Sequence, residues 1–245
     1  MKLYSEYPHA SVVMQDDPVL MELLRRVIRE RKFTHVLESG TYLGLGSTRF
    51  VAEAFPAESP PEIFVTLETS WELWRRAKAN LFKFPFVRPV WGLTVKRAAA
   101  LDFVRQDDFL KNHRQHPDVY IDNVDDPVAF YLNELAGRLD SRGASVSRRE
   151  KLERWFRWQG EDLLRRYLVK FRERSPLIIL DSAGGIGFLE FSILLETMSG
   201  RPYTLLLDDV HHVKHYRSRQ HILKDPDFSL LGSSETHGWL LAEHR

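Results

Sequence analysis

The stretch VLESGTYLGLGSTRF, residues 36–50, runs from an apolar segment through three glycines into a pattern typical of a helix. Glycine lets the backbone turn tightly and approach a ligand, and a helix that begins there offers unpaired N–H groups. The spacing is not the Gly-x-Gly-x-x-Gly of dinucleotide-binding folds, and the lysine of a phosphate-binding P-loop is missing. We expect a buried strand, a tight turn beside a ligand and a helix. A strand-to-helix turn without a ligand is the alternative.

This stretch contains the first of several short apolar runs along the chain, and helical patterns separate the runs. The runs are FTHVLESG (33–40), EIFVTLETS (62–70), PLIILDSAGG (176–185) and YTLLLDD (203–209), with a weaker one, VRPVWGLTV (87–95). Apolar runs without alternation are typical of strands buried on both faces of a parallel sheet. The first helical pattern has Asp17 as N-cap and Pro18 at its first position. This order predicts a doubly wound, Rossmann-like α/β fold with a mostly parallel seven-stranded sheet.

Two segments depart from this order. Residues 228–243 contain two short runs with almost nothing between them, which predicts an antiparallel hairpin at the C-terminal end of the sheet. Residues 97–174 contain several helical patterns, and the basic, aromatic-rich pattern at 147–174 predicts an amphipathic helix. We interpret 97–174 as a helical insertion between the third and fourth strands of a single domain spanning 1–245. It would serve as a cap or as an oligomerisation element.

Composition and charge exclude several classes of protein. The chain has 245 residues, of which 43% are hydrophobic, enough for one large α/β domain. Lys and Arg number 35 against 34 for Asp and Glu, so the net charge of +1 predicts no general attraction to nucleic acid or membranes. Cysteine is absent, which excludes disulfides, thiolate metal sites and cysteine nucleophiles. Without a signal-peptide pattern or an apolar stretch of membrane-spanning length, a soluble cytoplasmic protein is expected.

A second carboxylate, Glu68, closes the strand pattern FVTLE. An acid there is placed to accept hydrogen bonds from both ribose hydroxyls of a nucleoside. At this point the chain resembles the class I S-adenosylmethionine-dependent methyltransferases. Their acid followed by Gly-x-x-x-Gly is matched by Glu38, Gly40 and Gly44, and their acid at the end of strand two by Glu68. The sheet of that family also ends in an antiparallel hairpin.

The resemblance covers residues 33–96 and 176–245 and implies S-adenosylmethionine as the cofactor, lying across the strand ends. It places the methionyl end near Glu38 and Gly40, the ribose on Glu68 and the adenine near Gly92 and Thr94, with Thr41, Gly44, Gly46, Ser47 and Asp181 as further cofactor-binding positions. A dehydrogenase also uses an acid at a strand end, but it would need the tighter glycine spacing.

Three aspartates follow the last two predicted parallel strands. Asp181 ends LIILD, and Asp208 and Asp209 end LLLDD. Neighbouring strands would bring these carboxylates to one edge, and oxygen ligands at that density suit Mg²⁺ or another divalent cation such as Mn²⁺. The arrangement is similar to that of the metal-dependent O-methyltransferases of the catechol and macrolide-sugar types. A bound ion would lower the pKa of a substrate hydroxyl. The alternative is that the aspartates cap the following helices.

A proton acceptor is harder to find. Catechol-type relatives place a lysine shortly after the acid of strand four, whereas this chain continues as DSAGGIG, with no base. His211, His212 and Lys214 follow strand five and are the candidates to act as catalytic base instead. The pattern HHVKHYRSRQHIL, residues 211–223, also predicts a helix on which these side chains form an exposed face.

The sequence therefore predicts an enzyme that transfers a methyl group from S-adenosylmethionine to a hydroxyl oxygen of a small molecule, with help from a divalent metal. One alternative is an RNA methyltransferase that uses the basic insertion, although nucleic acid is the less favoured partner. The other is a catalytically degenerate ligand-binding member of the same fold. No membrane partner is expected, and the insertion is a candidate contact in a homo-oligomer.

Overall fold

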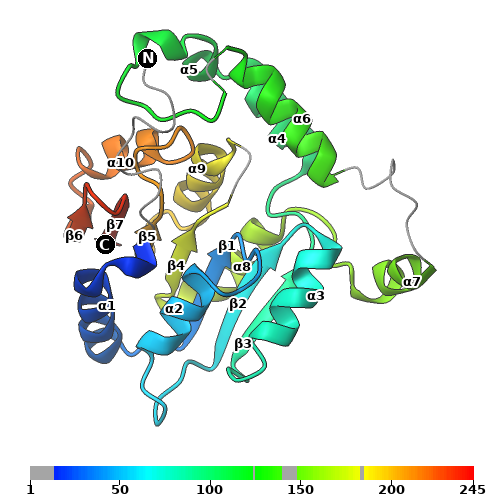
Figure 1. The fold of residues 1–245 in the computed structure, drawn as a ribbon. Helices are drawn as coiled ribbons and strands as arrows, with labels where there is room; N and C mark the ends of the chain where they lie inside the picture. Colours follow the sequence, from blue (N-terminus) through cyan, green and yellow to red (C-terminus); the bar gives the residue numbers. More distant parts are fainter. Residues whose placement is uncertain (1–13, 124, 140–147, 183–184) are drawn as a thin grey trace.

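The computed structural model describes residues 14–123, 125–139, 148–182 and 185–245. The strands of these residues form one sheet in the order β3-β2-β1-β4-β5-β7-β6, in which β7 runs opposite to the other six (Figure 1). Their bounds are β1 His35–Ser39, β2 Ile63–Glu68, β3 Val87–Trp91, β4 Leu177–Leu180, β5 Tyr203–Leu207, β6 Phe228–Ser234 and β7 Trp239–His244. The predicted seven-stranded sheet with a C-terminal antiparallel hairpin is confirmed.

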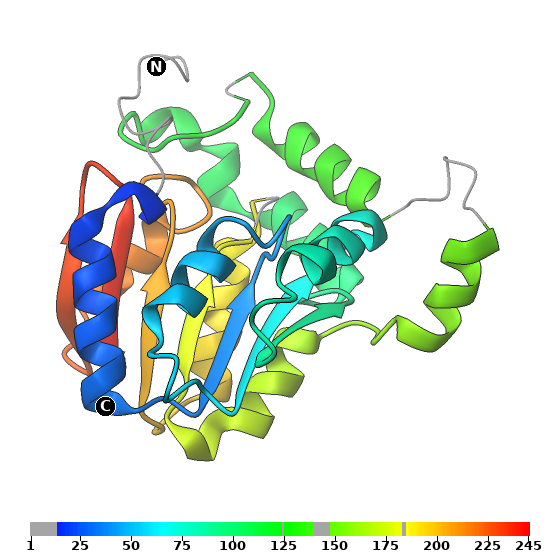
Figure 2. The same ribbon diagram turned by 60° about the horizontal axis from the view of Figure 1, so that its bottom comes forward.

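Helices cover both faces of the sheet, which explains why the strand patterns are apolar throughout (Figures 1 and 2). On β1, Val36 packs into the core on one face and Leu37 into the core on the other. The first face carries α1 Pro18–Arg31, α2 Ser47–Ala54 and α3 Trp71–Asn80, and the second carries α8 Leu163–Phe171, α9 Gly187–Thr197 and α10 Tyr216–Ile222. Among the described helices, none combines the length and the apolar character that a membrane crossing requires.

The first helix begins as its sequence predicts. The Asp17 side chain accepts the N–H of Val19 at 2.9 Å, and Pro18 occupies the first helical position. The second carboxylate oxygen of Asp17 accepts the indole N–H of Trp239 at 2.8 Å. Because Trp239 starts β7, this helix cap also ties the N-terminal helix to the C-terminal hairpin.

The predicted insertion, residues 97–174, divides into two structural parts. The helices α4 Arg97–Gln106, α5 Asp108–Lys111 and α6 Pro127–Leu139 lie beyond the carboxyl ends of the parallel strands (Figures 1 and 2). In contrast, α8 packs on the sheet and is fully buried at Leu164 and Leu168. It is therefore the crossover helix between β3 and β4, and the segment that can act as a cap ends before it.

The prediction of one amphipathic helix over 147–174 is wrong, because the chain forms α7 Arg148–Arg157 and then α8. Between the two helices, Gly160 has a φ of +90°, and its carbonyl accepts the N–H of Leu93 at 2.9 Å. This contact with the chain leaving β3 ends the helix at a point that the local pattern does not reveal. On α7, Trp155 and Phe156 are exposed rather than packed inward.

The helix predicted over 211–223 is shorter than expected. Only α10, which starts at Tyr216, is helical, and the preceding residues form turns. The turn begins at Asp209, whose φ is +53°, and the carbonyl of Asp209 accepts the N–H of His212 at 2.9 Å. The three candidate bases therefore lie on a turn directly after β5, and not on an exposed helix face.

Candidate functional site

A cavity lies at the carboxyl ends of the central strands, below α4 and α6. The strand order reverses between β1 and β4, and in open α/β sheets ligands bind at such a reversal. The cavity is lined by Gly40, Leu67, Glu68, Thr69, Leu93, Thr94, Val95, Arg97, Ala100, Leu135, Ser182 and Ile186. Three predicted cofactor positions, Gly40, Glu68 and Thr94, thus come from the ends of different strands and meet at one cavity. Their role remains a prediction.

Two of the three glycines of the first turn, Gly40 and Gly44, are required by the backbone conformation and the packing. Gly40 has a φ of +91°, and a Cβ there would lie 2.2 Å from the carbonyl oxygen of Asp181. Gly44 has a φ of +69°, and a Cβ there would lie 2.6 Å from a methyl group of Leu81. Both positions would be strained by any side chain, with or without a ligand. The other predicted positions of this turn are Thr41, whose hydroxyl lies 2.6 Å from that of Thr66, and Gly46 and Ser47, where α2 begins.

Glu38 is completely buried beneath this turn. Its Oε2 accepts the hydroxyls of Thr48 at 2.6 Å and Thr66 at 2.5 Å, whereas its Oε1 has no hydrogen-bond partner among the described residues. Burial raises the pKa of Glu38 to about 7, against the opposing effect of the threonine hydroxyls. The carboxyl group is therefore poised between its neutral and charged forms near neutral pH.

Glu68 is held in one orientation by the backbone. Its Oε2 accepts the N–H of Tyr42 and its Oε1 the N–H of Ser70, both at 2.8 Å. Tyr42 has a φ of +52°, an uncommon conformation for a tyrosine, which directs its N–H to the carboxylate. Glu68 thus presents a carboxylate of fixed orientation at the wall of the cavity.

Gly92 and Thr94 differ in their surroundings. A Cβ at Gly92 would lie 2.5 Å from a methyl group of Leu163 and 2.6 Å from the carbonyl oxygen of Gly160. The absence of a side chain at Gly92 therefore allows the segment around Gly160 and Leu163 to pack against it. Thr94 lines the cavity directly. Of the two predicted adenine positions, only Thr94 is among the residues that line the cavity.

Glu190 is a buried acid that the sequence analysis missed. It lies in the first turn of α9, and its Oε2 accepts the hydroxyls of Ser39 and Ser182, each at 2.8 Å. Burial raises its pKa. Its carboxylate links the carboxyl ends of strands β1 and β4 behind the cavity. The available signal was a single acid inside the otherwise apolar pattern GFLEFSILL.

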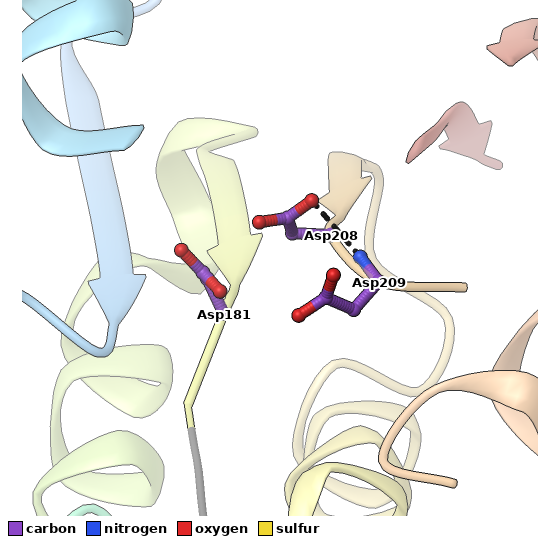
Figure 3. A group of neighbouring side chains, drawn as sticks. All are labelled: Asp181, Asp208 and Asp209. Atoms are coloured by element: carbon purple, nitrogen blue, oxygen red, sulfur yellow. Dashed lines mark hydrogen bonds between the residues drawn. The ribbon is translucent and has the colours of Figure 1, made fainter. Parts of the chain in front are cut away.

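Asp181, Asp208 and Asp209, called the acid edge below, meet as predicted from the order of the strands (Figure 3). Each offers one carboxylate oxygen within 4.8 Å of the others. A positive charge is already among them, because the Nζ of Lys214 lies 3.0 Å from Asp181 Oδ1 and 2.8 Å from Asp209 Oδ2. The side chain of this lysine is only 6% exposed. The acid edge is thus partly neutralised from within the chain.

The ionisable groups of the acid edge shift one another's pKa values. Burial and the neighbouring carboxylates raise the pKa of Asp208 well above its usual value. The ammonium of Lys214 lowers the pKa of Asp209 despite partial burial. Burial by itself would lower the pKa of Lys214, but the carboxylates of Asp209 and Asp181 raise it overall. Lys214 therefore remains a cation at neutral pH.

The two predicted histidines have partners of their own. His212 places its Nε2 3.0 Å from Asp122 Oδ2, and its Nδ1 accepts the N–H of Lys214 at 3.2 Å. The hydroxyl of Tyr131 donates to the same Asp122 oxygen at 2.9 Å. His211 has its Nε2 3.0 Å from the carbonyl oxygen of Glu235. The contacts of Asp122 and Tyr131 with His212 were not predicted, because they join segments 81 to 90 positions apart.

Comparison with known proteins finds only distant structural similarities. No protein-family model and no curated protein matches the sequence. Among solved structures, the O-methyltransferase from Bacillus cereus in complex with S-adenosylhomocysteine has 15% identity and a TM-score of 0.47, with 96% of this chain and 86% of that chain covered. The O-methyltransferase TomG from Streptomyces achromogenes in complex with S-adenosylmethionine has 14% identity and a TM-score of 0.44, with 93% and 78% covered. An rRNA methylase from Streptococcus thermophilus has 9% identity and a TM-score of 0.39, with 92% of each chain covered. Similarities this low assign no activity to the chain.

Proposed function

We propose that this chain is an enzyme that binds S-adenosylmethionine in the cavity at the strand ends and transfers its methyl group to a hydroxyl oxygen of a small molecule. The observation that carries the proposal is the meeting of Gly40, Glu68 and Thr94 at one cavity. Gly40 and Glu68 match motifs in separate parts of the chain, and Thr94 is the position at which the same resemblance places the adenine.

The lining of the cavity fits a nucleoside. Glu68 presents a carboxylate in a fixed orientation, suited to accept two ribose hydroxyls. Leu93, Val95, Leu135 and Ile186 provide apolar contacts of the kind that an adenine ring requires. When bound, S-adenosylmethionine would supply a methyl group on a positively charged sulfur. The buried carboxyl of Glu38 would then favour a cationic ligand group near the first turn.

The acceptor hydroxyl must lose its proton, and the three predicted bases are not equally suited. Lys214 is a cation held by carboxylates, and both ring nitrogens of His212 make contacts within the protein. These two residues would hold the neighbouring carboxylates in place and would not accept the proton. His211, whose side chain is 16% exposed and whose Nε2 lies 3.0 Å from the Glu235 carbonyl oxygen, is the third candidate proton acceptor.

A divalent ion does not fit the acid edge as it stands. The three carboxylates have the chemistry of a cation site. However, an ion bound between Asp181 and Asp209 would require the space that the Nζ of Lys214 takes. We therefore derive no catalytic step through a metal.

The second candidate function is nucleoside binding without turnover. It is favoured by the engagement of His212 and Lys214 in contacts within the protein. Cofactor binding with no methyl transfer to any hydroxylated acceptor, at several pH values, would support this alternative over the enzyme.

Isothermal titration calorimetry with S-adenosylhomocysteine tests the cofactor assignment. We expect saturable binding by the wild type, weakened by about 1–3 kcal/mol in Glu68→Ala, because ligand hydroxyls would lose their acceptor. Glu62→Ala is the matched control, since Glu62 is an exposed glutamate at the opposite end of the β2 segment. Absence of binding at millimolar ligand, or equal losses in the two variants, would refute the assignment.

A further inference from the structure

The ammonium of Lys214 lies among the carboxylates of the acid edge, where a divalent ion would bind. Its ammonium contacts Asp181 Oδ1 at 3.0 Å and Asp209 Oδ2 at 2.8 Å. These two carboxylates come from the ends of neighbouring strands, β4 and β5, and Figure 3 shows Asp208 beside them. One side chain therefore bridges the two strand ends.

The backbone holds this lysine in place. The N–H of Lys214 donates to His212 Nδ1, and the Nε2 of that histidine contacts Asp122. On the other side, Gly187 approaches so closely that a Cβ there would lie 2.6 Å from the Lys214 carbonyl oxygen. The side chain thus starts from a fixed backbone position and is only 6% exposed. Lys214 is therefore fixed at the acid edge by its surroundings, unlike an exposed surface lysine that forms an ion pair.

An ammonium and a divalent ion compete for this space. Mg²⁺ and Ca²⁺ bind carboxylate oxygens at about 2.0–2.6 Å, so an ion bridging Asp181 and Asp209 would overlap the ammonium that now bridges them. Three carboxylates within 4.8 Å of one another need some positive charge. Lys214 supplies it without an external ligand.

We propose that Lys214 is the resident cation of the acid edge, in the position that a divalent ion would otherwise take, so that the wild-type chain binds no divalent ion there. The ammonium holds the ends of β4 and β5 together and fixes the carboxylates beside the ligand cavity. Lys214 is in this view a positioning residue. The inference rests on the acid edge alone and goes beyond the proposed methyl transfer.

Titration with Mn²⁺, followed by the electron paramagnetic resonance signal of the free ion, tests the proposal. The wild-type chain should show no saturable binding below millimolar Mn²⁺. Lys214→Met removes the ammonium while keeping an unbranched side chain, and should bind one Mn²⁺ at least about tenfold more tightly than the wild type. Adding Asp208→Asn to that variant should weaken the new binding again.

A control variant and the wild-type titration make the test decisive. Lys78→Met makes the same change at a lysine that lies over the ring of Trp74, away from the acid edge, and should leave Mn²⁺ binding unchanged. The wild-type titration needs no variant, so it decides the proposal even if Lys214→Met does not fold. Tight 1:1 binding by the wild type that Asp208→Asn abolishes would overturn the inference, and so would a folded Lys214→Met that binds no Mn²⁺. Failure to bind S-adenosylhomocysteine would refute the proposed function and leave this result untouched.

Discussion

Replacing Glu38 by glutamine should change the pH dependence of stability in a defined direction. The pKa of the buried carboxyl is about 7, compared with an ordinary value of 4.5. Because the folded chain binds this proton more tightly than the unfolded chain, folding becomes less favourable as the pH rises from about 4.5 to about 7. The protonated carboxyl contributes about 3 kcal/mol to the free energy of unfolding at low pH, and this contribution is lost completely above pH about 7. Glutamine has no proton to lose and should abolish this part of the pH dependence.

The hydrogen bonds define what else the substitution changes. The amide oxygen of glutamine can still accept the hydroxyls of Thr48 and Thr66, while its NH₂ replaces the oxygen that lacks a partner. An unsatisfied donor there would cost about 1–3 kcal/mol at every pH. The offset between variant and wild type is therefore less informative than its change with pH.

Urea unfolding of the wild type and Glu38→Gln between pH 4.5 and 8 measures this change. The free energy of unfolding of the variant, relative to the wild type, should increase by about 3 kcal/mol across the series. Glu62→Gln, at an exposed glutamate, is the control and should run parallel to the wild type. Parallel curves for Glu38→Gln as well would show that folding does not raise the pKa of Glu38, which would refute the reasoning from burial.

Two further predictions concern the turn and the cap. Gly40→Ala should destabilise the fold by at least about 2 kcal/mol in urea unfolding, because its Cβ would lie 2.2 Å from the Asp181 carbonyl oxygen; a neutral result would mean that the turn adapts easily. Since Arg97 and Leu135 line the cavity from α4 and α6, S-adenosylhomocysteine should increase the protection of both helices in hydrogen exchange, with α7 as internal control. Unchanged exchange in α4 and α6 would count against a cap.

The sheet was predictable because its signals are local. A strand buried on both faces must be apolar at nearly every position, and Val36 and Leu37 meet that requirement for opposite faces of β1. The meeting of Asp181 with Asp208 also followed from sequence, since strand order alone brings the ends of β4 and β5 together. In both cases, short-range pattern and sheet topology leave little freedom.

The errors arose where distant contacts override a local pattern. The helical pattern over 147–174 is interrupted at Gly160, which has a φ of +90° and whose carbonyl accepts the N–H of Leu93 from a distant part of the chain. The packing of α8 on the sheet was likewise not visible in its local pattern, which is that of any amphipathic helix. Glu190 was overlooked because its partners, Ser39 at the end of β1 and Ser182 just after β4, come from distant parts of the chain.

The consecutive aspartates at the end of β5 show how one lysine offsets two unfavourable features. Successive residues of a strand point to opposite faces, but the φ of +53° at Asp209 breaks this alternation and leaves its carboxylate near that of Asp208. The left-handed conformation costs about 1–2 kcal/mol, and the repulsion between the acids adds to it. The same turn redirects the chain so that Lys214 reaches back to both strand ends, which a helix over 211–223 would not have allowed. The feature that brings the charges together thus also delivers the cation that stabilises them.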